Sequence, residues 1–160
     1  MFVTHPFDPV FDTRSRVLVL GTMASKASRD SGFYYGHPRN RFWPVLAALF
    51  NASVPESIDD KKALLLQNGV ALWDVLRTCD IDASSDASIQ NPCANDFTTL
   101  FSALPNLRVF ANGQTATALY RKHVYQDTGI SIIPLPSTSP ANAAWTLVRL
   151  TEAWEKIKTV

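Results

Sequence analysis

Arg16-Val17-Leu18-Val19-Leu20-Gly21 is the stretch of sequence that decides the fold of this chain. A short apolar run that ends at a glycine is typical of a parallel strand buried on both faces of a sheet. Further runs of this kind occur at residues 70–75, 107–113 and 131–135. Because strands that alternate with helices form a parallel sheet covered on both faces, the sequence predicts an α/β fold with four parallel strands.

The segments between these strands have the patterns of helices. Pro55 suits the first turn of a helix that stops at Asn68-Gly69, and Asn95-Asp96 caps a short helix that ends at Leu104. Residues 22–41 are predicted to form a loop, which at about twenty residues is long enough to be functional in a compact domain. Residues 77–94 are predicted to be an irregular polar excursion. The helix that begins at Pro55 is predicted to span residues 55–67, and the other predicted helices span residues 42–51, 114–124 and 142–158.

Composition places the chain among ordinary globular proteins. It has 160 residues, of which 46% are hydrophobic and 18% are charged, and this is the size of one domain with its own core. We therefore predict a single domain over residues 1–160. No apolar run approaches the roughly 20 residues that span a bilayer, and the N-terminus lacks the pattern of a secretory signal. The sequence predicts a cytoplasmic protein, with a monomer as the default.

Metal, cofactor and disulfide chemistry are not expected. Cys79 and Cys93 are too few for an iron–sulfur cluster or a four-cysteine zinc site. The three histidines, His5, His37 and His123, are scattered and no pair has ligand spacing. We predict no metal and no cofactor.

The charge distribution favours contact with only a few phosphates. A net charge of +1 argues against electrostatic binding of nucleic acid over a large basic surface. Within residues 21–44, however, four basic side chains face a single acid, Asp30, and this is enough to hold the backbone around one nucleotide. A second cluster, residues 121–123, is equally consistent with a solvated surface. The four basic residues of the first cluster are Lys26, Arg29, Arg39 and Arg41.

One segment combines aromatic, basic and amide side chains: Tyr34-Tyr35-Gly36-His37-Pro38-Arg39-Asn40-Arg41-Phe42-Trp43-Pro44. Gly36 and Pro38 keep it out of regular structure, and the glycines at 32 and 36 indicate that Tyr34 and Tyr35 lie in an exposed loop. Aromatic rings beside guanidinium groups are suited to stacking a base and holding a phosphate backbone. The segment therefore predicts a nucleotide site.

Unusual polar residues follow the ends of all four predicted strands. Because ligands bind outside the carboxyl ends of strands in open parallel sheets, these segments are expected to converge on one crevice under the 22–41 loop. The residues concerned are those at 21–25, Asp74, Asn112 with Gly113, and Ser137, Thr138 and Ser139.

Each of these segments also has a structural interpretation. Residues 21–25 lack the spacing of a dinucleotide fingerprint or a P-loop and are consistent with a tight turn. Ser139 or Asn142 is suited to capping the last helix, and Asn112-Gly113 is a common turn. Asp74 is either a catalytic acid or a simple cap, of which we favour the cap. The tryptophans expected in the core are Trp73, Trp145 and Trp154.

Taken in order, these motifs resemble those of the uracil-DNA glycosylase superfamily. The segment His37-Pro38-Arg39-Asn40-Arg41-Phe42-Trp43 is similar to one in the mismatch-specific uracil and thymine glycosylases. The first and last motifs, residues 21–25 and 136–140, resemble the hypoxanthine-DNA glycosylase (DNA-deoxyinosine glycosylase) branch more closely. The resemblance implies a three-layer α/β sandwich. It also implies a monofunctional, metal-free enzyme that flips a deaminated base out of DNA and hydrolyses its N-glycosidic bond.

The resemblance also implies roles for individual residues. Asn40 would orient the attacking water at the sugar C1′, Tyr35 would stack on the extruded base, and Asn112 would contact the edge of that base. The remaining residues of the base pocket would be Thr22, Met23 and His37. The DNA backbone would be contacted by Ser25, Arg39, Ser137, Thr138 and Ser139.

Three positions depart from the family pattern. Met23 stands where an amide or a carboxylate often holds the water, and Ala24 stands where proline is usual. Leu135 replaces a histidine or asparagine that stabilises the departing base. These departures favour hypoxanthine over uracil as the substrate. The alternatives are a nucleic-acid-binding module of the same fold without strong catalysis, and a hydrolase of free nucleosides or nucleotides.

Overall fold

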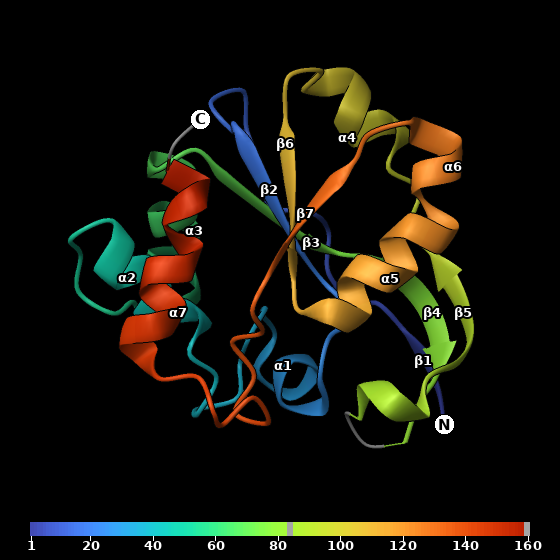
Figure 1. The fold of residues 1–160 in the computed structure, drawn as a ribbon, viewed down its shortest axis with the longest axis horizontal. Coiled ribbons are helices and arrows are strands. Elements are labelled where there is room, and N and C mark those ends of the chain that lie inside the picture. Colours follow the sequence, from blue (N-terminus) through green and yellow to red (C-terminus); the bar gives the residue numbers. More distant parts are fainter. Residues whose placement is uncertain (83–84, 159–160) are drawn as a thin grey trace.

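Strand β2 (Val17–Gly21) lies in the middle of the main sheet, and all five of its residues are buried. The structure is a computed structural model that describes residues 1–82 and 85–158. The spatial order of the sheet is β3 (Val70–Asp74), β2, β6 (Arg108–Asn112) and β7 (Ile132–Leu135), as Figure 1 shows. Every neighbouring pair in this sheet is parallel. The predicted four-stranded parallel sheet is confirmed.

Alternate residues of β2 point into two separate cores. Val17 and Val19 pack with Phe42, Leu46 and Trp154, whereas Leu18 and Leu20 pack on the opposite face of the sheet. This alternation follows from the pleat of a strand. It explains why the whole apolar run is buried, and it confirms the three-layer sandwich.

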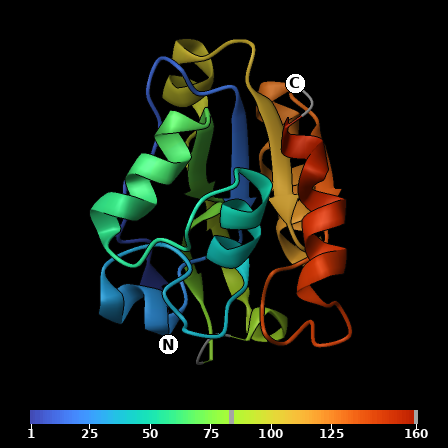
Figure 2. The same cartoon turned by 90° about the vertical axis from the view of Figure 1, so that its left-hand side faces the viewer.

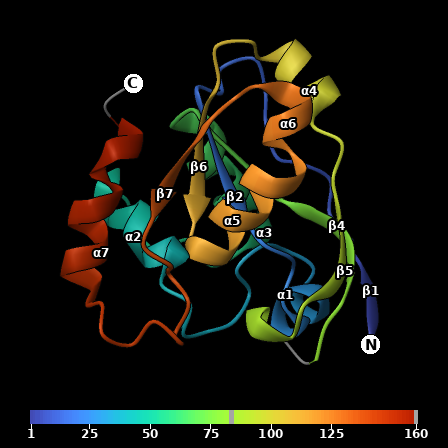
Figure 3. The ribbon, with the colours of Figure 1, turned by 45° about the vertical axis from the view of Figure 1, so that its right-hand side comes forward.

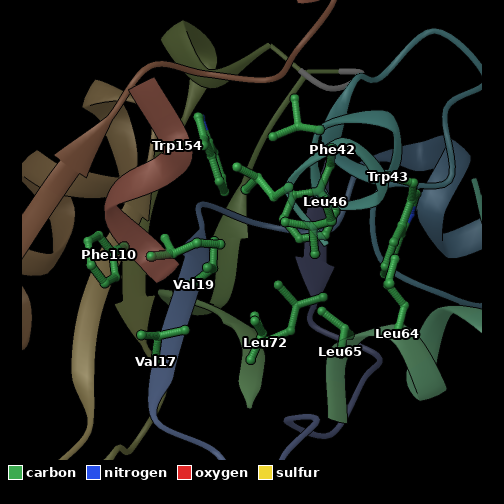
Figure 4. Close-up of a cluster of buried hydrophobic side chains, with 14 of the residues drawn as sticks. Val17, Val19, Phe42, Trp43, Leu46, Leu64, Leu65, Leu72, Phe110 and Trp154 are labelled. Carbon is green, nitrogen blue, oxygen red and sulfur yellow. The ribbon is translucent and has the colours of Figure 1, made fainter. Parts of the chain in front are cut away.

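Helices α2 (Phe42–Leu49), α3 (Ile58–Gln67) and α7 (Leu147–Trp154) cover the first face. They lie together on one side of the sheet in Figure 2, and Figure 4 shows the side chains that they bury against it. Helices α4 (Thr98–Ala103) and α5 (Gln114–His123) cover the second face. Two short elements follow these helices: α6 (Tyr125–Thr128) after α5, and the 3₁₀ turn η2 (Glu155–Lys158) after α7.

Two of the predicted helices begin later than expected. Helix α3 starts at Ile58 because the Ser57 side chain accepts from the backbone N–H of Asp60. Helix α7 starts at Leu147, where Thr146 is the N-cap, and not at residue 142. In both helices a hydroxyl that satisfies a free N–H group of the first turn sets the boundary. Neither Ser139 nor Asn142 caps α7.

The prediction of an irregular excursion at residues 77–94 is wrong for most of that segment. Strands β4 (Leu76–Asp80) and β5 (Gln90–Ala94) pair in an antiparallel manner, and β1 (Phe2–Thr4) completes a second sheet in the order β1-β4-β5. A 3₁₀ turn, η1 (Asp86–Ser88), lies between β4 and β5. Pro92 is tolerated because β5 is an edge strand. Residues 83 and 84 of the predicted excursion lie outside the described residues.

The predicted 22–41 loop contains a helix, α1 (Lys26–Ser31). The Ser25 side chain caps its first turn by accepting from the N–H of Ser28, and Gly32 ends it in the left-handed region. The helix is short and has no apolar stripe, so periodicity does not reveal it. Figure 3 places α1 beside the second sheet, below the end of β2.

Within the described part of the chain, no helix combines the length and apolar character needed to cross a bilayer. Over the same residues, no three or more His, Cys, Asp or Glu side chains are grouped so that they could hold a metal ion. Both cysteine thiols are free, with Cys79 buried and Cys93 exposed.

Candidate active site

A cavity of about 1040 Å³ opens at the carboxyl ends of the main-sheet strands. This is the lower end of the sheet in Figure 1, where α1 and the segment after β7 lie close together. The predicted convergence of the four strand ends is confirmed, because each contributes to the wall. The predicted site residues that line the cavity are Thr22, Met23, Ser25, Tyr35, His37, Asn40, Asn112, Ser137, Thr138 and Ser139. Arg39 is exposed and is not part of the lining.

Asn40, Thr138 and Asn112 form a hydrogen-bonded network in one wall of the cavity. The Thr138 hydroxyl donates to Asn40 Oδ1 at 2.8 Å and accepts from Asn112 Nδ2 at 2.9 Å. The backbone N–H of Thr138 donates to Asn112 Oδ1 at 3.0 Å. Thr138 has no exposed surface. It was predicted to contact the DNA backbone, but its side chain instead joins the two amides.

The network fixes the orientation of the Asn40 amide. Its Oδ1 also accepts from the backbone N–H of Phe42 at 2.9 Å. Because a backbone N–H can only donate, the oxygen must lie on this side and Nδ2 on the other. Among the described residues, Nδ2 has no hydrogen-bond partner, so it is available to a molecule in the cavity.

Tyr35 forms a second wall in an unusual backbone conformation. Its φ of 53° lies in the left-handed region, which a residue other than glycine seldom adopts and which is often found at functional sites. One face of its ring stacks on Phe42, with the centroids 4.1 Å apart. The backbone N–H of Gly36 donates to the Ser28 hydroxyl at 3.0 Å, which ties this turn to α1. A Cβ atom at Gly36 would lie 2.2 Å from the Ser31 hydroxyl, so only glycine fits so close to the helix.

The hydroxyl of Tyr35 is buried and has no hydrogen-bond partner in the described structure. Asn112 approaches it without reaching the geometry of a hydrogen bond. Burial and then the negative charge of Asp74 raise the pKa of this hydroxyl far above its ordinary value. Tyr35 therefore stays neutral throughout the physiological range.

His5, which does not itself line the cavity, contacts a residue of the cavity floor, and the sequence did not indicate its importance. His5 Nε2 lies 2.7 Å from Asp74 Oδ2, and Asp74 lines the cavity at the end of β3. Gly21 allows this arrangement, because a Cβ atom there would be 2.4 Å from Asp74 Oδ1 and 2.8 Å from the Tyr35 hydroxyl. No local signal links two residues 69 positions apart in the chain, so His5 could not be identified from spacing.

The other predicted base-pocket residues have different surroundings. Thr22 is buried, whereas Met23 is half-buried and packs against the core that contains Leu18 and Leu20. His37 Nδ1 accepts from the backbone N–H of Arg39 at 3.1 Å, and its carbonyl accepts from the N–H of Asn40 at 3.0 Å. His37 thus shapes the turn that presents Asn40.

Arg41 holds the segment after β7 in place. Its guanidinium donates to the carbonyls of Ser139 at 2.9 Å and Asn142 at 3.0 Å, and also to that of Trp145. The hydroxyls of Ser137 and Ser139 accept from backbone N–H groups within the same segment. Arg41 is therefore a brace for this loop.

Two aromatic predictions are corrected. Tyr34 is only 2% exposed, and its hydroxyl donates to the carbonyl of Asp8, so it belongs to the core and not to an exposed loop. Trp145 is half-buried, lines the cavity and carries the Arg149 guanidinium over its ring at 4.2 Å. Trp154 is fully buried, as predicted.

A parallel α/β sandwich with amides and an aromatic platform around a crevice at its strand ends has the architecture of a base-excising enzyme. A sequence profile described as the Uracil DNA glycosylase superfamily matches residues 9–158. The chain belongs to this superfamily, as the motifs in its sequence indicate.

Individual relatives agree with this assignment. A protein of Methanosarcina acetivorans named hypoxanthine DNA glycosylase is 31% identical over 157 residues, which cover 97% of this chain and 98% of the relative. A protein of the same name from Methanosarcina barkeri is 33% identical over 111 residues, covering 68% of this chain and 70% of the relative. A solution NMR structure of a Methanosarcina acetivorans protein, described provisionally as a uracil DNA glycosylase, matches with a TM-score of 0.80 and 27% identity over 99% of both chains.

Proposed function

We propose that this protein is a DNA glycosylase that removes a deaminated base, hypoxanthine above all, by hydrolysis of its N-glycosidic bond, leaving an abasic site. The observation that carries the proposal is the Asn40 amide, held by Thr138 and Phe42 in the same cavity as Tyr35. The names of the relatives from both Methanosarcina species support hypoxanthine as the base.

In this proposal, Asn40 positions the water that attacks C1′ of the sugar. Its Oδ1 already accepts from two donors, so Nδ2 is the group that binds the water oxygen. A neutral amide orients water but does not deprotonate it strongly. That is sufficient where the sugar has become strongly cationic before the water bonds to it, because orientation alone then lowers the barrier.

Tyr35 supplies the platform for the extruded base. Phe42 covers one face of the ring, which leaves the other face for stacking. Extrusion of a base costs a few kcal/mol, and stacking on an aromatic ring returns about 1–3 kcal/mol. Because Phe42 holds the ring in place, the enzyme orders few further groups when the base enters. In this proposal, Thr22, Met23 and His37 complete the pocket.

Asn112 has a divided role. Its oxygen and one N–H group are used by Thr138, which leaves the second N–H of Nδ2 for the base. We assign this N–H to an acceptor on the base edge, where negative charge grows as the bond breaks. Leu135 is buried in the core and supplies no polar group to the departing base.

We assign contacts with the DNA backbone to residues on the rim of the cavity. Ser25, Ser137 and Ser139 line the cavity, and Arg39 is exposed next to it in the chain. Because the Thr138 hydroxyl is used inside the wall, we no longer assign it to a phosphate. The proposal includes extrusion of the base from the duplex and action as a monomer in the cytoplasm.

A single-turnover assay tests the proposed function. Duplexes that contain hypoxanthine or uracil and free inosine are each incubated with excess protein, and abasic sites or free base are measured. We expect abasic sites from hypoxanthine DNA, slower release of uracil, and no turnover of free inosine. Binding of hypoxanthine DNA without any cleavage would identify a binding module instead, and turnover of free inosine without preference for DNA would identify a nucleoside hydrolase.

A further inference from the structure

The contact between the side chains of His5 and Asp74 is buried, unlike the ion pairs of the described residues. The two side chains are 1% and 5% exposed, whereas the partners in the Arg14–Asp12 and Lys26–Asp30 pairs are substantially exposed. A buried carboxylate is costly to a fold, because the group loses its hydration. Its position in the floor of the cavity therefore calls for a functional explanation.

His5 holds Asp74 in a defined position. Its ring packs against Phe7 and Tyr34, and its Nδ1 lies 3.0 Å from the carbonyl oxygen of Phe7 and 3.3 Å from the backbone nitrogen of the same residue. Its Nε2 donates to Asp74 Oδ2 at 2.7 Å, because an ionised carboxylate can only accept. One oxygen of the carboxylate is thus anchored from behind by a ring that packing keeps in place.

The other oxygen is free. In residues 1–82 and 85–158, no donor bonds to Asp74 Oδ1, which lies beside Gly21 in the cavity floor. Burial and then the Asp74 charge raise the pKa of Tyr34 and of Tyr35, so both hydroxyls stay protonated. The Tyr34 hydroxyl donates to the carbonyl of Asp8, and the Tyr35 hydroxyl makes no hydrogen bond to Asp74. The floor therefore presents a fixed acceptor that lacks a donor.

We propose that Asp74 is a specificity-determining residue: its Oδ1 accepts a hydrogen bond from the ring N–H of a lactam base, and His5 is the positioning residue that aims it. This inference rests on the proposed function. Hypoxanthine carries a hydrogen on N1, whereas adenine carries a lone pair there, so a carboxylate attracts the first and repels the second. A site that hydrogen-bonds one substrate group strongly rejects an analogue that leaves the site unpaired.

The wild-type protein gives the first test, with no change to its fold. Single-turnover cleavage is measured on DNA that contains hypoxanthine, adenine or N1-methylhypoxanthine, the last of which lacks the ring N–H. We expect the hypoxanthine rate to exceed the N1-methylhypoxanthine rate by about 100-fold or more. Equal rates on these two bases would overturn the inference while leaving the proposed function intact.

Asp74→Asn gives the second test. Either orientation of the new amide weakens the contact, because it presents a mismatched NH2 group or a neutral oxygen in place of a charged one. We expect hypoxanthine cleavage to fall by about 10- to 100-fold and the ratio between hypoxanthine and N1-methylhypoxanthine to shrink. His5→Phe is expected to reduce the same ratio, and His5→Gln, which keeps a side-chain donor, to restore part of it.

Asp59→Asn is the matched control, because it removes the same charge from an exposed position in the first turn of α3, outside the cavity lining. We expect the ratio to change by no more than about twofold in this variant. An Asp74→Asn protein that keeps the wild-type ratio would overturn the inference. If Asp74→Asn does not fold, the wild-type comparison of substrates decides. A wild-type protein that cleaves no deaminated base would instead remove the proposed function, and this inference with it.

Discussion

The two sides of the cavity differ in how far their polar groups are already satisfied. On one side, Asn40, Thr138 and Asn112 bond to one another, and every link has a defined donor and acceptor. On the other side, Asp74 keeps a free oxygen and Tyr35 a buried hydroxyl without a partner. Buried polar groups without partners are uncommon in folded proteins and are costly. The difference separates a wall whose hydrogen bonds hold its geometry from a carboxylate, Asp74, that can still accept a hydrogen bond from a ligand.

This division suits a reaction with two separate demands. Water must be placed against the sugar with little freedom, and a hydrogen-bonded wall does this before the substrate arrives. The base must be distinguished from normal bases, and an acceptor that is satisfied only by the correct edge does that. The structure therefore assigns catalysis and selectivity to different residues.

Phe42 joins the two sides, and its replacement should have the largest effect on the fold. Its ring is fully buried and stacks on Tyr35. We expect Phe42→Ala to lower the free energy of unfolding by about 3–5 kcal/mol, the cost of removing a large buried ring. Chemical denaturation measures the change. Phe2→Ala, at an exposed position, is the control and should change stability by less than about 0.5 kcal/mol; equal losses in both variants would contradict the role of Phe42.

Thr138→Val should remove side-chain hydrogen bonds from the wall formed by Asn40, Thr138 and Asn112 while nearly keeping the volume of the side chain. The variant removes the hydroxyl that links Asn40 to Asn112. We expect a loss of about 1–3 kcal/mol in stability, because a buried amide group is left unpaired. The cleavage rate should fall by about 10- to 100-fold, because Asn40 loses one of the two donors that orient it. Thr138→Ser keeps the hydroxyl and should retain most of the rate; if Thr138→Val cleaves as fast as wild type, the network does not position the water.

The buried hydroxyl of Tyr35 should make the stability of the protein depend on pH in alkaline solution. Burial and the charge of Asp74 raise the pKa of Tyr35 in the folded protein, so the folded state holds a proton that the unfolded state loses above pH ~10. Stability should therefore be unaffected below that pH and fall as pH rises above it, by up to about 1.4 kcal/mol per pH unit for each such tyrosine.

Tyr35→Phe removes this proton linkage. Near pH 8 we expect its stability to lie within about 1 kcal/mol of wild type, and its cleavage rate to be nearly unchanged because the stacking face remains. The free energy of unfolding, measured by denaturation at about pH 8, 9.5 and 11, should fall less steeply with pH in this variant than in wild type. Identical declines in the two proteins would mean that the hydroxyl titrates like that of an unfolded chain.

The sequence predicted the parts of the molecule that depend on local pattern. The central strands and α2 follow from unbroken apolar runs, and the convergence of polar residues follows from strand direction. The second sheet was missed because β4 and β5 are polar and depend on pairing with β1, far away in the chain. Helix α1 was missed because its boundaries come from caps and it has no apolar stripe.

The candidate site also has features that follow from local sequence pattern and features that depend on distant contacts. Asn40, Tyr35 and Asn112 could be named from their motifs, but the bonds that orient them could not. The link between Asn40 and Thr138 spans 98 positions of sequence, and the link between His5 and Asp74 spans 69. Such contacts depend on how the elements pack, and a residue type alone does not reveal its partner.

Asn40→Ala, measured for binding and cleavage in parallel, tests the central claim most directly. The claim predicts that the variant binds hypoxanthine DNA with nearly wild-type affinity and cleaves it about 100- to 1,000-fold more slowly, because the placement of water is lost while Tyr35 and the rim residues remain. Asn106→Ala, an exposed asparagine at the opposite end of β6 from the cavity, should match wild type in both assays. An Asn40→Ala protein that cleaves at the wild-type rate would contradict the account.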